Sequence, residues 1–224
     1  MKRNAEMTEQ HWHEVIHSPK DGTSPVLSIC GPSGVGKTTV VVALANHYPT
    51  FIEATKGNPH LKNLLAGKTG FNAAANQEWF LRRIGRHISR ANSRTPLILD
   101  QDPAAIVLAY SRMFLEDGNM TEVQYNSLLE RLLKIEEKLH DWRCPRTVLF
   151  LDAPADVLRQ RILQRWGKLR TPPLKWFERA RNHFVKLFTC FPNAIAASTV
   201  ELSPEQVVSR AEGLIKSRAK GAQA

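Results

Sequence analysis

The sequence has few cysteines and no long apolar segment. Cys30, Cys144 and Cys190 are too few and too scattered among the 224 residues for a disulfide framework or a zinc site. No apolar run approaches the roughly 18 residues that a membrane-spanning helix needs. Residues 1–24 are polar and lack the apolar stretch of a secretory signal. We therefore expect a cytoplasmic protein without a membrane partner.

The composition is ordinary for a globular protein, but the charge is unevenly distributed. Hydrophobic residues make up 42% of the chain and charged residues 23%, which favours one compact domain over a disordered or fibrous chain. The formal net charge is +10, and the stretch from position 150 onward holds 13 basic and 6 acidic residues. This excess favours an anionic partner, either a nucleic acid or a small molecule that carries phosphate, unless it is a solvated basic face.

Apolar segments of strand length alternate with segments of helical periodicity. We expect a polar arm at 1–24, one domain at 25–218 and a tail at 219–224. The alternation predicts an α/β fold with a parallel sheet of about five strands and helices on both faces. The predicted strands are 26–30, 50–53, 95–100, 146–152 and 193–200. The predicted helices are 38–47, 71–92, 121–142, 173–188 and 204–216, with two more opened by Asp102–Pro103 and by Pro154.

A glycine-rich loop follows the first predicted strand. Residues 31–38, Gly-Pro-Ser-Gly-Val-Gly-Lys-Thr, fit G-x-x-x-x-G-K-[ST] at every fixed position and precede a predicted helix. Backbone N–H groups of such a loop cradle phosphate oxygens, which predicts a three-layer P-loop NTPase fold. Lys37 should reach the β- and γ-phosphates of ATP or another nucleoside triphosphate, and Thr38 should ligate Mg²⁺. The alternative is a glycine-rich turn without a ligand. The residues expected to bind the nucleotide are Gly31, Ser33, Gly34, Val35, Gly36, Lys37, Thr38 and Thr39.

Two motifs that would assign this loop to other classes of nucleotide-binding protein are absent. No Asn-Lys-x-Asp stretch, which reads guanine in GTPases, occurs in the sequence. No Leu-Ser-Gly-Gly-Gln stretch, typical of transporter ATPases, occurs either. Their absence counts against a GTPase and against a transporter ATPase.

Acidic and basic residues suited to phosphoryl transfer follow the predicted strands. A small-molecule kinase needs a base near the acceptor hydroxyl, a carboxylate near the metal and cations near the transferring group. Glu53 ends the second predicted strand and Asp100 the third, at the edge where open α/β sheets bind ligands. Arg161 and Arg165 share one helix face after the fourth strand. Each of these residues can instead be a solvated surface charge.

The order of these features along the chain resembles the deoxynucleoside kinase family over about residues 26 to 210. The family places a base after its phosphate loop at the interval of Glu53, and a nucleobase-reading Gln on a helix at the position of Gln77. The joint order is more specific than any single motif. The other matching segments are Asn58-Pro59-His60-Leu61, Gln77-Glu78-Trp79-Phe80-Leu81, Leu97-Ile98-Leu99-Asp100, Glu116 to Thr121, Val148 to Asp152 and Arg161-Ile162-Leu163-Gln164-Arg165.

The resemblance implies a role for each matching residue. Glu53 would take the proton from a 5′-hydroxyl group, and Asp100 would assist at the Mg²⁺ ion. Arg161 and Arg165, in a lid at about 161–171, would close over the γ-phosphoryl group. Gln77 and Tyr110, with Glu53 and Asp100, would bind the acceptor. The implied activity is transfer of a γ-phosphoryl group to a deoxynucleoside, and a homodimer is left open.

The sequence differs from the family in the half that binds the acceptor. Gln101 stands where the family has an Arg after its strand-end acid, and Ile106 stands near the acid that partners the base-reading Gln. Gly167 replaces a third lid Arg, and Arg170 or Thr171 replaces a sugar-binding Glu. We interpret Asp152 as structural, as a cap of the helix that Pro154 begins.

Three alternatives to a deoxynucleoside kinase remain at this point. The first keeps the chemistry and takes a nucleoside monophosphate as the acceptor, with the basic third of the chain holding its phosphate. The second is an ATP-binding protein that binds nucleic acid through that basic third. The third is a relative of the kinases that binds ATP and transfers nothing, for which Gln101 is the main argument.

Overall fold

A five-stranded parallel sheet forms the centre of the molecule. The computed structural model describes residues 26–52, 57–61, 72–91, 95–141, 146–167 and 171–221. Every strand pair is parallel, and the strand order is β2-β3-β1-β4-β5. The predicted α/β fold with about five parallel strands is confirmed. The strands are β1 (Val26–Cys30), β2 (Thr50–Phe51), β3 (Leu97–Asp100), β4 (Arg146–Asp152) and β5 (Ala194–Ser198).

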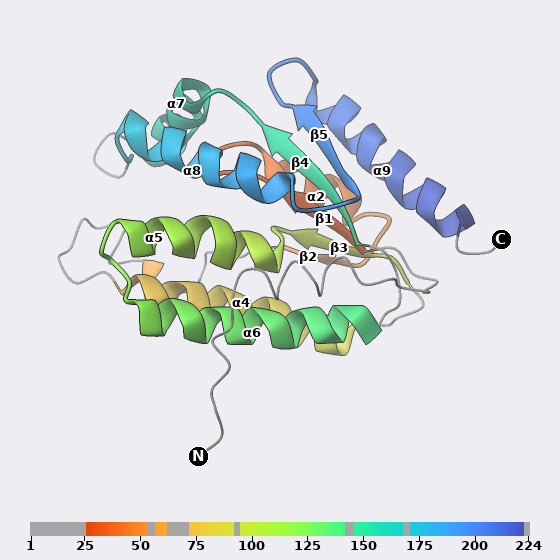
Figure 1. Ribbon diagram of the computed structural model, residues 1–224. Coiled ribbons are helices and arrows are strands. Elements are labelled where there is room, and N and C mark those ends of the chain that lie inside the picture. The colour runs from red at the N-terminus through yellow and green to blue at the C-terminus, as the bar shows by residue number, and fades with distance from the viewer. Residues whose placement is uncertain are drawn as a thin grey trace.

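Helices cover both faces of this sheet, so the fold has three layers (Figure 1). Alternate residues of β1 face opposite layers: Leu27 and Ile29 pack against α2, α7 and α9, whereas Val26 and Cys30 pack against α4, η1 and α6. The long helix α8 contacts α7, η1 and β4. The helices are α2 (Lys37–Leu44), α4 (Ala73–Arg90), η1 (Ala105–Ser111), α5 (Arg112–Glu116), α6 (Glu122–Asp141), α7 (Ala155–Trp166), α8 (Leu174–Phe188) and α9 (Pro204–Gly221).

The helix after Asp102 is not a regular α-helix. Residues Ala105–Ser111 form a π-helix, η1, before the chain returns to α-helical geometry in α5. The Ser111 hydroxyl donates a hydrogen bond of 2.8 Å to the carbonyl of Ile106, five residues earlier. Within this π-helix, a side-chain hydroxyl group thus supplies a hydrogen bond to the Ile106 carbonyl. Such turns occur often at functional sites.

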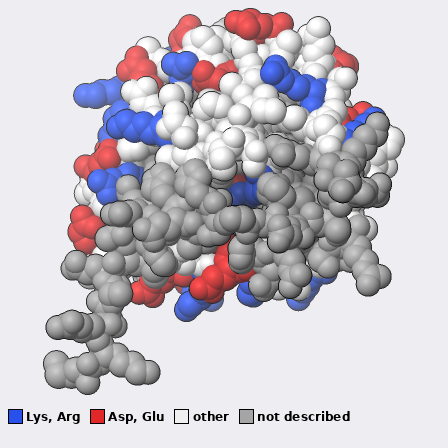
Figure 2. Space-filling model, turned by 45° about the vertical axis from the view of Figure 1, so that its right-hand side comes forward, with Lys and Arg blue, Asp and Glu red and all other residues white. Residues whose placement is uncertain are grey.

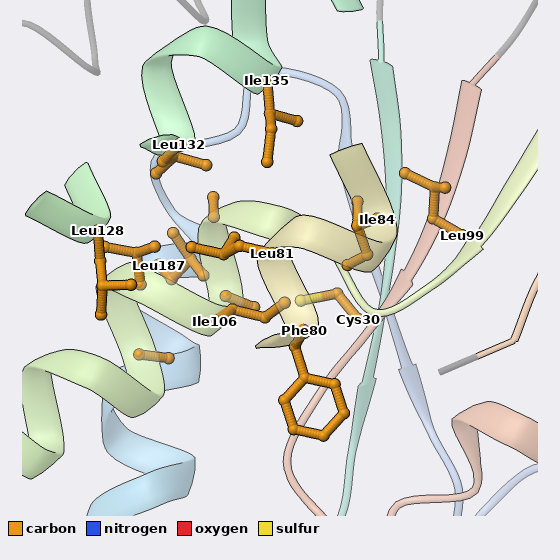
Figure 3. Close-up of a cluster of buried hydrophobic side chains, with 14 of the residues drawn as sticks. Cys30, Phe80, Leu81, Ile84, Leu99, Ile106, Leu128, Leu132, Ile135 and Leu187 are labelled. Atoms are coloured by element: carbon orange, nitrogen blue, oxygen red, sulfur yellow. The ribbon is translucent and has the colours of Figure 1, made fainter. Parts of the chain in front are cut away.

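The larger apolar cluster surrounds Ile106, one of the positions where the sequence departs from the family. Figure 3 shows Ile106 beside Leu81 and Phe80 of α4 and near Cys30 at the end of β1. The side chain of Ile106 is 1% exposed. Burial raises the pKa of the neighbouring Cys30 thiol, so this thiol stays protonated. The side chain at this position offers a buried hydrocarbon surface.

One group of buried charges ties three elements together. Arg146, at the start of β4, lies 3.2 Å from the Asp102 carboxylate through Nε and 2.8 Å from Glu136 of α6 through Nη1. The side chains of Asp102 and Glu136 are fully buried. Burial lowers the pKa of Arg146, but the two carboxylates outweigh it and raise the pKa overall. The guanidinium therefore stays charged and anchors α6 beneath the sheet.

The surface carries both signs of charge on the face seen in Figure 2, where basic and acidic side chains are interspersed. Several arginines of the basic C-terminal third are bound to protein groups: Arg181 pairs with Asp152, and Arg179 pairs with Asp117 and Glu116. Part of the excess positive charge is thus engaged within the fold. Among the described residues, no helix is both long enough and apolar enough to cross a lipid bilayer.

Candidate active site

The phosphate loop leaves β1 at its carboxyl end and leads into α2. Gly31 has φ of +152°, and a Cβ atom there would lie 2.4 Å from the carbonyl oxygen of Leu151. Gly34 has φ of +87°, and a Cβ atom there would lie 2.8 Å from the carbonyl oxygen of Leu158. Both positions therefore require glycine, because the loop presses against β4 and α7 while it turns. This close fit holds the backbone in the shape of a cradle.

Lys37 is buried at the base of this cradle. Its side chain is 8% exposed, and its ammonium group donates hydrogen bonds to the carbonyls of Gly31 (2.7 Å) and Pro32 (3.2 Å). These two carbonyls of the phosphate loop thus fix the position of the ammonium group. A positive charge at the start of a helix suits the phosphates of a nucleotide.

Thr38 and Asp100 meet beside Lys37. The Thr38 hydroxyl donates a hydrogen bond of 2.9 Å to Oδ2 of Asp100, and Asp100 is fully buried. The parallel register aligns Ile29 of β1 with Asp100 of β3, which brings the strand-end acid to the loop. A hydroxyl and a carboxylate side by side are oxygen ligands of the kind that Mg²⁺ takes next to phosphates. The pair therefore fits a magnesium ion that accompanies the nucleotide.

A cavity of about 500 Å³ opens from the phosphate loop. Its far end is formed by the chain after β5 and by the start of α9. The loop residues Ser33 to Val40 line one side of the cavity, so a nucleotide held there would have its phosphates at the loop. It is lined by Ser33 to Val40, Leu151, Arg161, Ile162, Arg165, Trp166, Thr199, Leu202, Pro204 and Val207.

The two predicted lid arginines occupy different places in this cavity. Arg161 donates two hydrogen bonds of 2.8 Å to Thr199, one to the hydroxyl and one to the carbonyl, so it belongs to the wall beyond β5. Arg165 lies one turn later on α7, and its guanidinium is 5.9 Å from the centre of the Trp166 ring. Arg165 is exposed and forms no ion pair with the described residues, so it is the better placed of the two to reach a phosphate.

Two of the residues predicted to bind the acceptor lie on α4 and η1. Gln77 lies on α4 with 4% exposure. Tyr110 lies on η1, and its hydroxyl is 2.9 Å from the hydroxyl of Ser33 in the phosphate loop. The ring of Tyr110 stacks on Trp176 of α8 and meets Phe184 edge-on. Glu53 lies outside the described residues, as do residues 168–170 of the expected lid.

Some features of the site were not predicted from the sequence. The bond of Arg161 to Thr199 joins positions 38 residues apart, and Thr199 follows a strand at the edge where the other site residues lie. That strand-end rule could have found Thr199, whereas the stacking of Trp176 on Tyr110 has no sequence signal. The prediction that Asp152 caps α7 is wrong. Its carboxylate accepts two hydrogen bonds from Arg181, of 2.8 Å and 2.7 Å, and α7 has no side-chain cap.

The structure shows no cluster of metal-ligating side chains in the part of the chain that it describes. There, no group of three or more His, Cys, Asp or Glu side chains is gathered as a metal site would require.

Comparison with known proteins agrees with this geometry. The family model for deoxynucleoside kinases matches residues 27–191, whereas no curated protein sequence gives a match. Among solved structures, the fold is similar to that of deoxyadenosine kinase from M. mycoides. The structure with dCMP and a flexible dCDP has 13% sequence identity and a TM-score of 0.65, covering 86% of this chain and 98% of that chain. Its dCTP complex has 14% identity and a TM-score of 0.66, covering 86% and 99%. Its dATP complex has 14% identity and a TM-score of 0.66, covering 84% and 98%.

The matched residues include the phosphate loop, Asp100, Arg161, Arg165 and four of the five strands, β1 from its second residue to β4. The phosphate loop, Asp100 and the two arginines are far apart in the sequence, but they lie together at one edge of the sheet in a P-loop fold. The chain belongs to the deoxynucleoside kinase family.

Proposed function

We propose that this protein transfers the γ-phosphoryl group of ATP, or of another nucleoside triphosphate, to the 5′-hydroxyl group of a deoxynucleoside. The observation that carries the proposal is the hydrogen bond between Thr38 and Asp100 beside the buried Lys37. It supports a site for a nucleotide with its metal ion, in a chain of this family. The deoxynucleotides bound to the M. mycoides enzyme support an acceptor of the same class.

In this proposal the described residues have separate tasks. The phosphate loop and Lys37 bind the β- and γ-phosphates, and Thr38 and Asp100 hold Mg²⁺, which neutralises phosphate charge when it is bound. Arg165 stabilises charge on the transferring group, and Arg161 supports the nucleotide end of the cavity. Gln77 and Tyr110 bind the acceptor.

Glu53 is the proposed base. It follows β2 by two residues in the sequence, and β2 pairs with the strand that ends in Asp100. We expect Glu53→Gln to abolish transfer and to leave binding of the triphosphate nearly unchanged, because an amide cannot take the proton. Glu130→Gln, on the exposed face of α6, is the matched control and should keep full activity. Equal loss of transfer and binding in Glu53→Gln would contradict its role as the base.

The direct test is transfer of radiolabelled γ-phosphate from Mg-ATP to a set of acceptors. The set contains the four deoxynucleosides, their monophosphates and an oligonucleotide with a 5′-hydroxyl end. Label on a deoxynucleoside supports the proposal. Label on a monophosphate or on the oligonucleotide would keep the chemistry and overturn the acceptor. Absence of label, with ATP still bound, would overturn the proposal as a whole.

A further inference from the structure

Gln101, next to the phosphate loop, has a backbone conformation and a buried side-chain oxygen that both lower the stability of the fold. It is the first residue after β3, and its φ of +85° is the only positive value of a non-glycine residue within the described ranges. Its backbone N–H donates to the carbonyl of Ile29 (3.0 Å), and its side chain is 1% exposed. Left-handed backbone at such a residue costs free energy and persists where the surrounding structure enforces it, often at functional sites.

The amide of Gln101 is bound to the same carbonyl as Lys37. Its Nε2 donates to the Gly31 carbonyl at 3.4 Å, and Lys37 Nζ donates to that oxygen at 2.7 Å. The amide oxygen, Oε1, is buried and has no hydrogen-bond partner among the described residues. A buried acceptor without a partner destabilises the fold. Gln101 thus lowers stability while it contacts the loop.

We propose that Gln101 is a positioning residue for Lys37. Its amide holds the Gly31 carbonyl from one side, and this carbonyl in turn holds the Lys37 ammonium group where the phosphates of the nucleotide bind. A carbonyl oxygen has two lone pairs, so both donors can be bound at once. The inference rests on the proposed function of the loop as a triphosphate site. It concerns a position where this chain has an uncharged amide, which can orient the carbonyl without adding a second positive charge beside Lys37.

The test is Gln101→Met, which keeps the length of the side chain and removes the amide. We expect the dissociation constant for a non-hydrolysable analogue of Mg-ATP, measured by calorimetry without acceptor, to rise by about tenfold. A change of this size is expected when a hydrogen bond that orients a charged group is lost. The melting temperature should stay equal or rise, because the variant also removes the buried Oε1. A residue with only a structural role would instead lower the melting temperature. KM for the acceptor should not change.

Thr147→Val is the matched control. Thr147 lies within β4, and its buried hydroxyl oxygen also lacks a hydrogen-bond partner among the described residues. Its replacement should leave the affinity for the Mg-ATP analogue unchanged. A rise in the dissociation constant as large as that of Gln101→Met would show a general effect of altering the buried sheet and would overturn the inference.

A cycle with Lys37→Met tests whether the effect passes through Lys37. Without the ammonium group, Gln101→Met should cause no further loss of affinity. A further tenfold loss in that background would overturn the inference. So would wild-type affinity in Gln101→Met alone. If the wild-type protein does not bind the Mg-ATP analogue, the proposed function itself fails; if it binds and Gln101→Met binds equally well, only this inference fails.

Discussion

The hydroxyl groups of Tyr110 and Ser33 lie 2.9 Å apart, although 77 positions separate the two residues in the sequence. Ser33 belongs to the phosphate loop and lines the nucleotide cavity. Tyr110 belongs to η1, in the region proposed to bind the acceptor, where its ring is 6.3 Å from that of Trp176 with an angle of 19° between the planes. This hydrogen bond therefore connects the two halves of the proposed site.

Removal of this bond should weaken transfer without unfolding the protein. We expect Tyr110→Phe to lower kcat/KM for the acceptor by roughly fivefold, which corresponds to one hydrogen bond of about 1 kcal/mol. Ser33→Ala should have a similar effect, and the double variant should lose no more than either single variant. The measurement is a double-mutant cycle on kcat/KM. Losses that multiply in the double variant would show that the two hydroxyl groups act independently.

Replacement of the Asp100 carboxylate should change the metal dependence of the reaction. Asp100→Asn removes the negative charge beside Thr38 and keeps the size of the side chain. The Mg²⁺ concentration for half-maximal activity should rise by roughly 10- to 100-fold, the range for groups that support a metal site. Titration of activity with Mg²⁺ checks this, with Asp156→Asn on the exposed start of α7 as the control. An unchanged Mg²⁺ requirement would remove Asp100 from the metal site.

The buried charges around Arg146 should contribute strongly to stability. Arg146→Met leaves the carboxylates of Asp102 and Glu136 buried without their cation, which should cost about 3–5 kcal/mol. Glu136→Gln should cost less, because the pair of Arg146 and Asp102 remains. Urea unfolding measures both, and Arg82→Ala, which breaks an exposed pair with Glu78, should cost less than about 1 kcal/mol. The reverse order of the first two variants would contradict a charge-based role.

Stability should fall as the pH drops below neutrality, in part because of His87. Burial lowers the pKa of His87 below its ordinary value of 6.5, and its Nε2 has no hydrogen-bond partner among the described residues. The unfolded chain therefore takes up this proton first. The contribution to the free energy of unfolding is complete above pH 6.5 and is lost as the pH falls towards the folded-state pKa. Urea midpoints at pH 7.5 and 5.5 should differ less in His87→Gln than in the wild type; an equal difference would exclude His87.

The strands and the phosphate loop were predicted from the sequence because their signals are local. Short apolar runs such as 26–30 and 146–152 identify buried strands, and the glycines of the loop stand between such a strand and a predicted helix, which is the context of a phosphate loop. The juxtaposition of Thr38 and Asp100 then follows from the parallel sheet, where strand ends share one edge. A helix after Asp102 was predicted at the right position, but its π-helical geometry was not predicted.

The unpredicted features depend on contacts between distant residues. Arg181 binds Asp152 from 29 positions away, and nothing in either segment distinguishes this pair from a solvated arginine and a helix cap. The amide of Gln101 reaches Gly31 only because β1 and β3 are neighbours in the sheet. The role of Glu53 stays a prediction, since this residue lies outside the described part of the chain.

The π-helical geometry of η1 makes the length of the segment Ala105–Ser111 part of the site. In an α-helix each residue advances the direction of the side chain by about 100°, so one residue more or fewer turns everything that follows. A single deletion within η1 that restored α-helical geometry would rotate Tyr110 away from Ser33, with no change in the composition of either element. Insertions and deletions in this segment would thus disconnect the two halves of the site as surely as loss of the tyrosine itself.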